Sequence, residues 1–336
     1  MNGNCDIKNP LVRDGVSQKQ RLLKALHTSY VKVDERDIND LLWFIRNYSK
    51  KVQYYNKDNE PDDDWKDFVE NDVSTIISII SQKDLSEIKE CFTAHFSFIK
   101  NAVNIDNQVK AVLNNIFKHL FFISGELNAW YKTSAAGLKL NTELKQTISS
   151  QLKGLLKELV AAYKFASTNS YLYDDITDKC YPFVYKDDFL VSKFNKIWID
   201  TTSSTPVSWS SYLSSINEDG SLFSTSSTKI KQVKFAADKL KLYVDKFIGA
   251  QSRLIHNSPG YLKETLENWS SHEPNMALLL AFLQLFRYAQ GSINKITKRH
   301  LDFYYKRVLR LKPNEAVPDT VHVIFELAKQ VDSYLV

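Results

Sequence analysis

Two long stretches of the chain repeat apolar residues at alternating steps of four and three positions. The first covers residues 107–131, and the second covers residues 229–256 with one polar step at Gln251. This spacing forms a continuous apolar seam along a helix, and such a seam packs against neighbouring helices over its whole length. We therefore expect two long helices at the centre of a bundle. The seams consist of Val109, Leu113, Ile116, Leu120, Ile123, Leu127 and Trp130, and of Ile230, Val233, Ala237, Leu240, Val244, Phe247 and Leu254.

Further amphipathic stretches predict additional helices. Residues 141–166 follow the first long helix after a loop of about nine residues, so this helix should lie antiparallel to it. Other helices are predicted after Asp34 and after Asp84. Pro259 is interpreted as the start of a separate short helix, because proline favours the first helical turn. The residues of the 141–166 helix expected to face inward are Leu144, Ile148, Leu152, Leu155 and Leu159.

The helical pattern fails between residues 168 and 228. Residues 171–199 are aromatic and mixed, which fits short strands or a folded loop. Residues 201–228 contain sixteen Ser or Thr, too polar and too aperiodic for a core element. We interpret this region as an exposed insertion. Its Trp209 and Tyr212 either dock locally or contact a partner.

The pattern near the C-terminus is different in kind. Residues 319–327 alternate apolar and polar side chains, which predicts a β-strand. A lone strand leaves its backbone donors and acceptors unpaired. Either it pairs within residues 171–200, or its partner strands lie beyond this sequence. We favour the second reading, in which a β-rich domain begins here.

These patterns predict a mainly α fold: an elongated bundle of long antiparallel helices, with a polar insertion and a C-terminal strand. Only 17 of the 336 residues are Gly or Pro, which disfavours a sandwich or barrel. The expected divisions are residues 1–167 for an N-terminal bundle, 168–228 for the insertion, 229–313 for helices that complete the bundle, and 314–336 for the start of a β-rich domain.

Charge and cysteine content change this picture little. The net charge of +5 is modest for the length and does not imply a polyanionic partner. Three widely spaced cysteines give no disulfide framework, which suits a reducing cytoplasm. The N-terminus lacks the apolar core of a signal peptide, and the longest apolar run, residues 276–283, is too short for a membrane span. We expect cytoplasmic synthesis and no membrane insertion.

No catalytic or cofactor-binding motif stands out in the sequence. Cys91 and His95 have the i, i+4 spacing of two metal ligands, but nothing nearby supplies the others, so a buried thiol beside a surface histidine is the simpler interpretation. His119 is interpreted as a core or rim histidine. The acidic run at residues 60–64 is explained by solvated charge and helix capping. We expect no enzyme activity, cofactor or metal; an enzyme with an unrecognised pocket between helices stays an alternative.

A basic and aromatic helix is predicted over residues 298–311. Its cations alternate with aromatic rings, a combination that can follow a phosphate backbone and stack on bases. Nucleic-acid binding through this helix is therefore a second functional hypothesis. The competing interpretation is an amphipathic helix with its charges in water. Arg299, Tyr304 and Arg307 are the candidate contacts here.

Three groups of short stretches resemble one protein family. They are QRLLKAL at 20–26 with YVKVDER at 30–36; QYYN at 53–56 with NEPDDDW at 59–65; and HLDFYY at 300–305 with AVPD at 316–319 and VIFELA at 323–328. Their order and spacing resemble the N-terminal region of the large baseplate J-like proteins of bacterial phage-tail-like contractile injection systems. The resemblance extends from about residue 17 to the C-terminus and is weakest across 168–228.

The resemblance implies a structural role. Such proteins are wedge components that surround the central spike and hub, contact neighbouring wedge proteins and help pass the firing signal to the sheath. It also implies a β-rich continuation after the strand that begins near Asp319, and it supplies no catalytic residue. We therefore expect a non-enzymatic assembly module of an injection particle, with wedge, hub, spike or sheath proteins as partners. Its candidate partner contacts are Tyr54, Tyr55, Trp65, Trp209, Tyr212, Arg299, Tyr304 and Arg307.

Overall fold

The computed structural model describes residues 28–173, 194–200, 208–226 and 228–312. The chain divides into two compact units, Arg36–Leu285 and a second that combines residues 1–35 with residues 286–336. The predicted strand at 319–327 lies outside the described residues. The domain boundaries expected from the sequence stay predictions.

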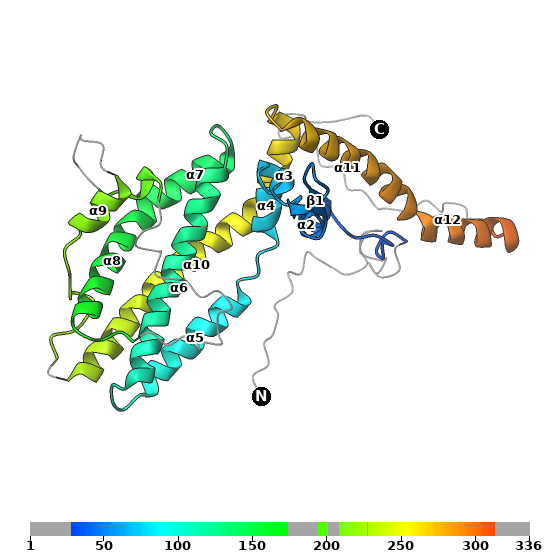
Figure 1. Ribbon diagram of the computed structural model, residues 1–336. Coiled ribbons are helices and arrows are strands. Elements are labelled where there is room, and N and C mark those ends of the chain that lie inside the picture. Colours follow the sequence, from blue (N-terminus) through cyan, green and yellow to red (C-terminus); the bar gives the residue numbers. More distant parts are fainter. Residues whose placement is uncertain (1–27, 174–193, 201–207, 227, 313–336) are drawn as a thin grey trace, which may run out of the picture. The chain divides into compact units, whose positions relative to one another are not determined.

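The larger unit is a helical bundle around two long helices. α6 spans Asn107–Thr133 and α10 spans Lys229–Asn268, and the two pack against each other (Figure 1). The side chain of Asp106 accepts a hydrogen bond from the amide of Val109 and so caps α6. The predicted seam of α6 is buried along its length, as is that of α10 from Val233 onward. The mainly α class is confirmed.

Shorter elements pack around these two helices. α4 and α5 both contact α10, while α2 contacts α4 and α5 contacts α6. Among the described residues the only sheet is a two-stranded antiparallel hairpin, which the sequence pattern did not reveal. The bounds are α2 Ile38–Ser49, β1 Gln53–Tyr55, β2 Pro61–Asp64, α3 Asp67–Glu70, α4 Val73–Ser81 and α5 Ser86–Asn101.

The predicted helix at 141–166 is longer and is interrupted by a π-helix. α7 (Lys139–Thr147), η2 (Ile148–Leu152) and α8 (Lys153–Thr168) follow one another directly, and α6 contacts both α7 and α8. Leu155 was expected to face inward, but Leu156 is buried instead. The buried leucines and isoleucine recur every four residues, and in a regular α-helix each such step turns about 40° too far. The wider π-turn absorbs this drift.

Pro259 lies inside α10 and does not start a new helix, so that sequence interpretation is wrong. Proline has no amide hydrogen, so it cannot donate to the carbonyl of Ile255 four residues earlier. The hydroxyl of Ser258 donates to that carbonyl at 2.7 Å instead. This side-chain bond replaces the missing backbone bond and lets the helix continue to Asn268.

The polar insertion contains a short helix that packs into the bundle. α9 spans Trp209–Ser215, and its Trp209 stacks on Phe194 with ring centroids 4.8 Å apart. The ammonium group of Lys164 in α8 donates to the carbonyls of Leu213 and Ile216 at 2.6 and 2.8 Å. These bonds tie α8 to carbonyls at the end of α9, where the Leu213 carbonyl also accepts from the backbone N–H of Ile216 at 3.4 Å. A 3-10 helix, η4 (Lys196–Trp198), lies nearby with its tryptophan buried.

The described part of the smaller unit consists of residues 28–35 and a helical stretch. α11 spans Pro274–Ile293 and so begins in the larger unit, while α12 (Ile296–Phe303) and the π-helix η5 (Tyr304–Val308) belong to the smaller one. The amide side chain of Asn294, between α11 and α12, accepts from the backbone N–H of Asp34 and donates to its carbonyl, both at 2.9 Å. One side chain therefore ties residue 34 to the α11–α12 junction.

The stretch Pro274–Val308 is, within the described residues, the one helical segment long and apolar enough to cross a membrane by length and composition. Only 22% of its most apolar window is buried. Met276, Leu280 and Leu283 face the interior of the bundle, whereas Leu278 and Leu285 on the same helix are exposed. α11 therefore has apolar residues on two sides: the side with Met276, Leu280 and Leu283 is buried, and the side with Leu278 and Leu285 is exposed.

Candidate interaction surfaces

An exposed aromatic cluster lies at the hairpin. Trp65 contacts Tyr54 edge-on with ring centroids 6.3 Å apart, and it packs on Phe68 of α3 at 5.0 Å. The three side chains retain 39–49% of their surface. We call these three residues the hairpin cluster. Large aromatic groups that stay half-exposed on a rigid base are typical protein-binding anchors.

Backbone and ionic contacts hold this cluster in place. The amide of Trp65 donates to the carbonyls of Ser49 and Val52 at 3.2 and 3.3 Å, which joins the end of the hairpin to the end of α2. The guanidinium of Arg46 contacts the carboxylate of Glu70 at 2.5 Å and ties α2 to α3. The cluster therefore rests on two helices that are fixed to each other.

The hairpin turn explains the acidic run. The side chain of Asn56 accepts from the amides of Asp58 and Glu60, both at 2.9 Å, and Asn59 adopts a left-handed conformation with φ of 59°. The carboxylate of Asp64 accepts from the amide of Lys66 at 2.9 Å. The acidic residues of β2 are largely solvated, as expected, but the expected helix capping is not found, because α3 begins at Asp67 without a side-chain cap.

The predicted contact residues fall in three different environments. Tyr54 and Trp65 meet in the hairpin cluster, and Tyr55 lies beside it with 48% of its surface exposed. Trp209 and Tyr212 are 7% and 3% exposed inside the larger unit, which matches local docking of the insertion. Their role as partner contacts stays a prediction that their burial does not support.

Arg299, Tyr304 and Arg307 belong to the smaller unit. Arg299 donates to the carbonyl of Ser292 and so caps the C-terminal end of α11. Tyr304 contacts Tyr305 edge-on at 5.6 Å, and Lys306 pairs with Asp302 at 2.9 Å. None of the residues of α12 and η5 is buried. The segment presents both rings and cations at its surface.

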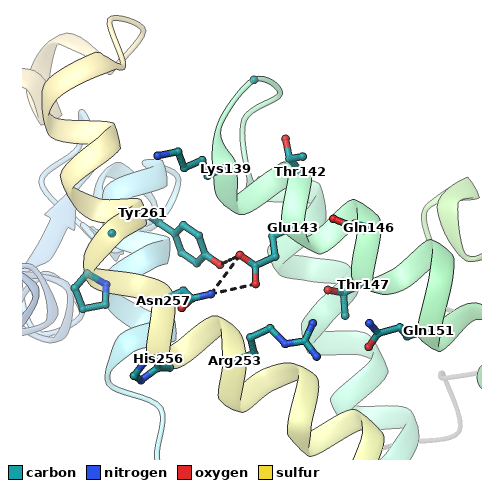
Figure 2. A pocket seen from close by; sticks show the side chains of 13 residues that line it. Lys139, Thr142, Glu143, Gln146, Thr147, Gln151, Arg253, His256, Asn257 and Tyr261 are labelled. Carbon is teal, nitrogen blue, oxygen red and sulfur yellow. Dashed lines mark hydrogen bonds between the residues drawn. The ribbon is translucent and has the colours of Figure 1, made fainter.

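A polar pocket of about 770 Å³ lies between α7–η2 and α10 (Figure 2). Glu143 projects into it from α7 and accepts hydrogen bonds from the Tyr261 hydroxyl and from the Asn257 amide at 3.2 Å. Burial of the ring, together with the neighbouring Glu143 carboxylate, raises the pKa of the Tyr261 hydroxyl above its ordinary value. Arg253 and Gln151 line the opposite end (Figure 2).

This pocket coincides with both irregular helix turns of the larger unit. Gln151 belongs to the π-helix η2, and Pro259 lines the pocket from α10. The pocket has the polar groups needed to hold a charged or amide-bearing side chain of a partner. Sequence reasoning missed it, although Pro259 within a heptad pattern was a visible signal of irregularity.

The histidines singled out in the sequence come together. His95 is buried and stacks on the ring of His119 with centroids 5.4 Å apart, while Phe92 meets His119 edge-on. Cys91 is partly exposed. The expected arrangement, a buried thiol beside a surface histidine, is therefore reversed. Among the described residues no group of three or more His, Cys, Asp or Glu side chains forms a candidate metal site.

Long packed helices with exposed aromatic and basic surfaces are typical of proteins that act through contacts with other proteins. Residues 218–336 match the model of one such family, described as Baseplate protein PVC11-like. The match covers slightly more than a third of the chain and includes α11 and α12. It supports a structural component of a phage-tail-like baseplate that interacts with other tail components. No curated protein matches the chain.

Proposed function

We propose that the chain is a wedge component of the baseplate of a contractile injection system, of the baseplate J-like kind, and that it has no enzymatic role. The family match over residues 218–336 carries this proposal. The resemblance of the hairpin stretch and of residues 300–305 to J-like proteins supports the finer identity. In this role the helical bundle is a rigid spacer, and its exposed surfaces bind wedge, hub, spike or sheath proteins.

The hairpin cluster supports the proposal because of its position on two fixed helices. A side chain that anchors a partner binds more tightly if it already has its bound geometry. A side chain that becomes ordered only on binding loses conformational entropy, and this loss weakens the contact. Trp65 is the centre of the cluster and contacts both of its other rings. We assign it the role of the main anchor.

The test is the composition of purified injection particles. We expect mass spectrometry of intact particles to find this chain in a fixed ratio to the sheath and tube proteins, and electron cryo-microscopy to place it beside the spike. Particles that assemble and contract without this chain would refute the proposal.

A variant series tests the hairpin cluster within that experiment. Replacing Trp65 and Tyr54 by alanine should reduce the amount of chain per particle roughly 30-fold, the loss expected when an anchor worth about 2 kcal/mol is removed. The matched control is Phe44→Ala with Tyr48→Ala, an exposed stacked aromatic pair on α2. Equal incorporation of both double variants would show that the hairpin cluster is not part of the interface.

A further inference from the structure

Residues 296–311 consist of a helical part, 296–308, and three irregular residues after it, and none of their side chains is buried. We call them the C-terminal helical segment; it consists of α12, η5 and the three residues after them. Apart from Leu301, which is less exposed, its large apolar residues retain about half of their surface or more. They are Ile296 (53%), Phe303 (61%), Tyr304 (47%), Tyr305 (47%), Val308 (54%), Leu309 (45%) and Leu311 (56%).

A segment of this length needs a neighbour to hold its shape. Isolated helices shorter than about 12–15 residues are marginal in water, and helices in proteins are stabilised mainly by packing an apolar face. Here the apolar residues are present, but the described structure does not cover them. Apolar surface of this density on one short segment marks a binding site.

The arrangement of side chains around the segment indicates the shape of its partner. At about 100° per residue, the arc from Phe303 through Ile296 and Tyr304 to Tyr305 spans roughly 200° and also contains the polar residues Thr297, His300 and Arg307. A helix that packs on one flat neighbour needs an apolar stripe only about 100° wide. The wider arc fits a groove that contacts the helix on several sides.

The charge of the segment indicates the chemistry of that groove. It carries five Lys or Arg residues against one acid, Asp302, which already pairs with Lys306. The segment alone therefore has a net charge of +4, while the whole chain has +5. Lys298, Arg299 and Lys306 occupy the side opposite the apolar arc, where they would meet the rim of a groove, whereas Arg307 lies within the arc and Arg310 follows the helix with a left-handed backbone conformation.

We propose that this segment docks as a helix into a groove of a neighbouring baseplate protein, with an apolar floor and an acidic rim. The inference rests on the proposed function, and the matched residues 218–336 contain the whole segment. Nucleic acid fits less well, because phosphates and bases do not cover aliphatic groups such as Ile296, Val308 and Leu311. A lipid surface fits less well, because it covers only one side of a helix.

The test uses photo-crosslinking in assembled particles. Benzoylphenylalanine replaces Tyr305 in the full chain, particles are purified and irradiated, and the adducts are mapped by mass spectrometry. We expect adducts on one other baseplate protein, at apolar residues flanked by Asp or Glu. The control position is Leu242 on α10, which is exposed to a similar degree and is expected to give no adduct at that groove.

The outcomes separate this inference from the proposed function. Particles without the chain contradict the proposed function itself. Particles that contain the chain but give adducts at Tyr305 with nucleic acid, with lipid or with this chain, or no adducts, overturn the docking inference alone.

A charge-reversal pair supplies a second measurement. The Lys298→Glu/Lys306→Glu variant should lower incorporation into particles at least tenfold, whereas Lys298→Arg/Lys306→Arg should retain most of it. Lys145→Glu/Lys246→Glu changes the net charge equally at exposed positions of other helices and should incorporate normally. Because the segment buries nothing, circular dichroism should show the same helix content in all three. Normal incorporation of the Lys298→Glu/Lys306→Glu variant would contradict the acidic rim.

Discussion

Ser258 shows how one side chain can repair a helix. Its hydroxyl donates to the Ile255 carbonyl, which Pro259 leaves without its usual amide donor. Ser258 is almost fully buried, so water does not replace this bond. A buried carbonyl without a partner costs about 1–3 kcal/mol. The hydroxyl therefore offsets part of what the proline costs α10.

This repair predicts a measurable coupling between the two positions. Ser258→Ala should lower the free energy of unfolding by about 1–3 kcal/mol, because the Ile255 carbonyl loses its donor. In a Pro259→Ala background the same change should cost clearly less, since position 259 then supplies a backbone N–H. Urea unfolding of the two single variants and the double variant gives the coupling energy. Additive effects would show that the hydroxyl does not replace the amide.

Residue-scale features of this kind are hard to read from a sequence. The heptad pattern was followed only to Leu254, and Pro259 was interpreted as the start of a separate helix, so the long helix was ended too early. The burial of His95 was missed for a related reason: its partner His119 comes from α6, and a single helix does not show which partner its polar residues meet.

At the scale of elements, the polar loop after α9 is fixed to α8 by a close approach. The amide of Asp219 donates to the carbonyl of Ala161 at 3.2 Å, and the ring of Phe165 lies directly against Gly220. A Cβ atom at position 220 would sit 2.8 Å from that ring. Phe223 packs on the same ring, with centroids 5.4 Å apart. Position 220 therefore requires glycine because a side chain would not fit beside the Phe165 ring, and not because of its backbone conformation.

The close approach predicts opposite effects at two glycines. Gly220→Ala should destabilise the protein by about 1–3 kcal/mol, because the loop or the Phe165 ring has to move. Gly154→Ala in α8 meets no atom within 4 Å and should stabilise it by up to about 1 kcal/mol, since alanine favours a helix. Thermal unfolding of both variants checks this. A neutral Gly220→Ala would show that the loop is not held against α8.

Sequence patterns predicted elements well where the repeating pattern covered many residues, and failed where it covered few. The 27 residues of α6 were predicted to within two residues, because seven seam positions specify one helix face. The hairpin was missed, because its strands of three and four residues are too short and too polar for an alternating pattern. The π-turn was missed as well, although its repeated four-residue spacing was visible. The hairpin cluster could only be guessed residue by residue, since its packing on α3 depends on that fold.

At the scale of the whole molecule, the described parts of the two units differ in how much apolar surface they bury. α6 and α10 are buried along their seams, whereas α12 and η5 bury nothing. Local opening costs least where few apolar contacts hold the backbone, so stability should be uneven along the chain.

This difference predicts the order of proteolysis. In the free protein, trypsin should cut after Arg299 or Arg307 before it cuts within α6 or α10, because cleavage requires local unfolding. A time course followed by mass spectrometry identifies the cut sites. In assembled particles the same two bonds should resist cleavage. Earlier cuts within α10 would contradict the uneven stability.

The grip of Asn294 on Asp34 has a mechanical consequence. The two hydrogen bonds between Asn294 and Asp34 would be loaded together. Tension on the chain before residue 34 would therefore reach the start of α12 directly through Asn294. A pull applied before residue 34 would thus load the same junction that leads into the C-terminal helical segment.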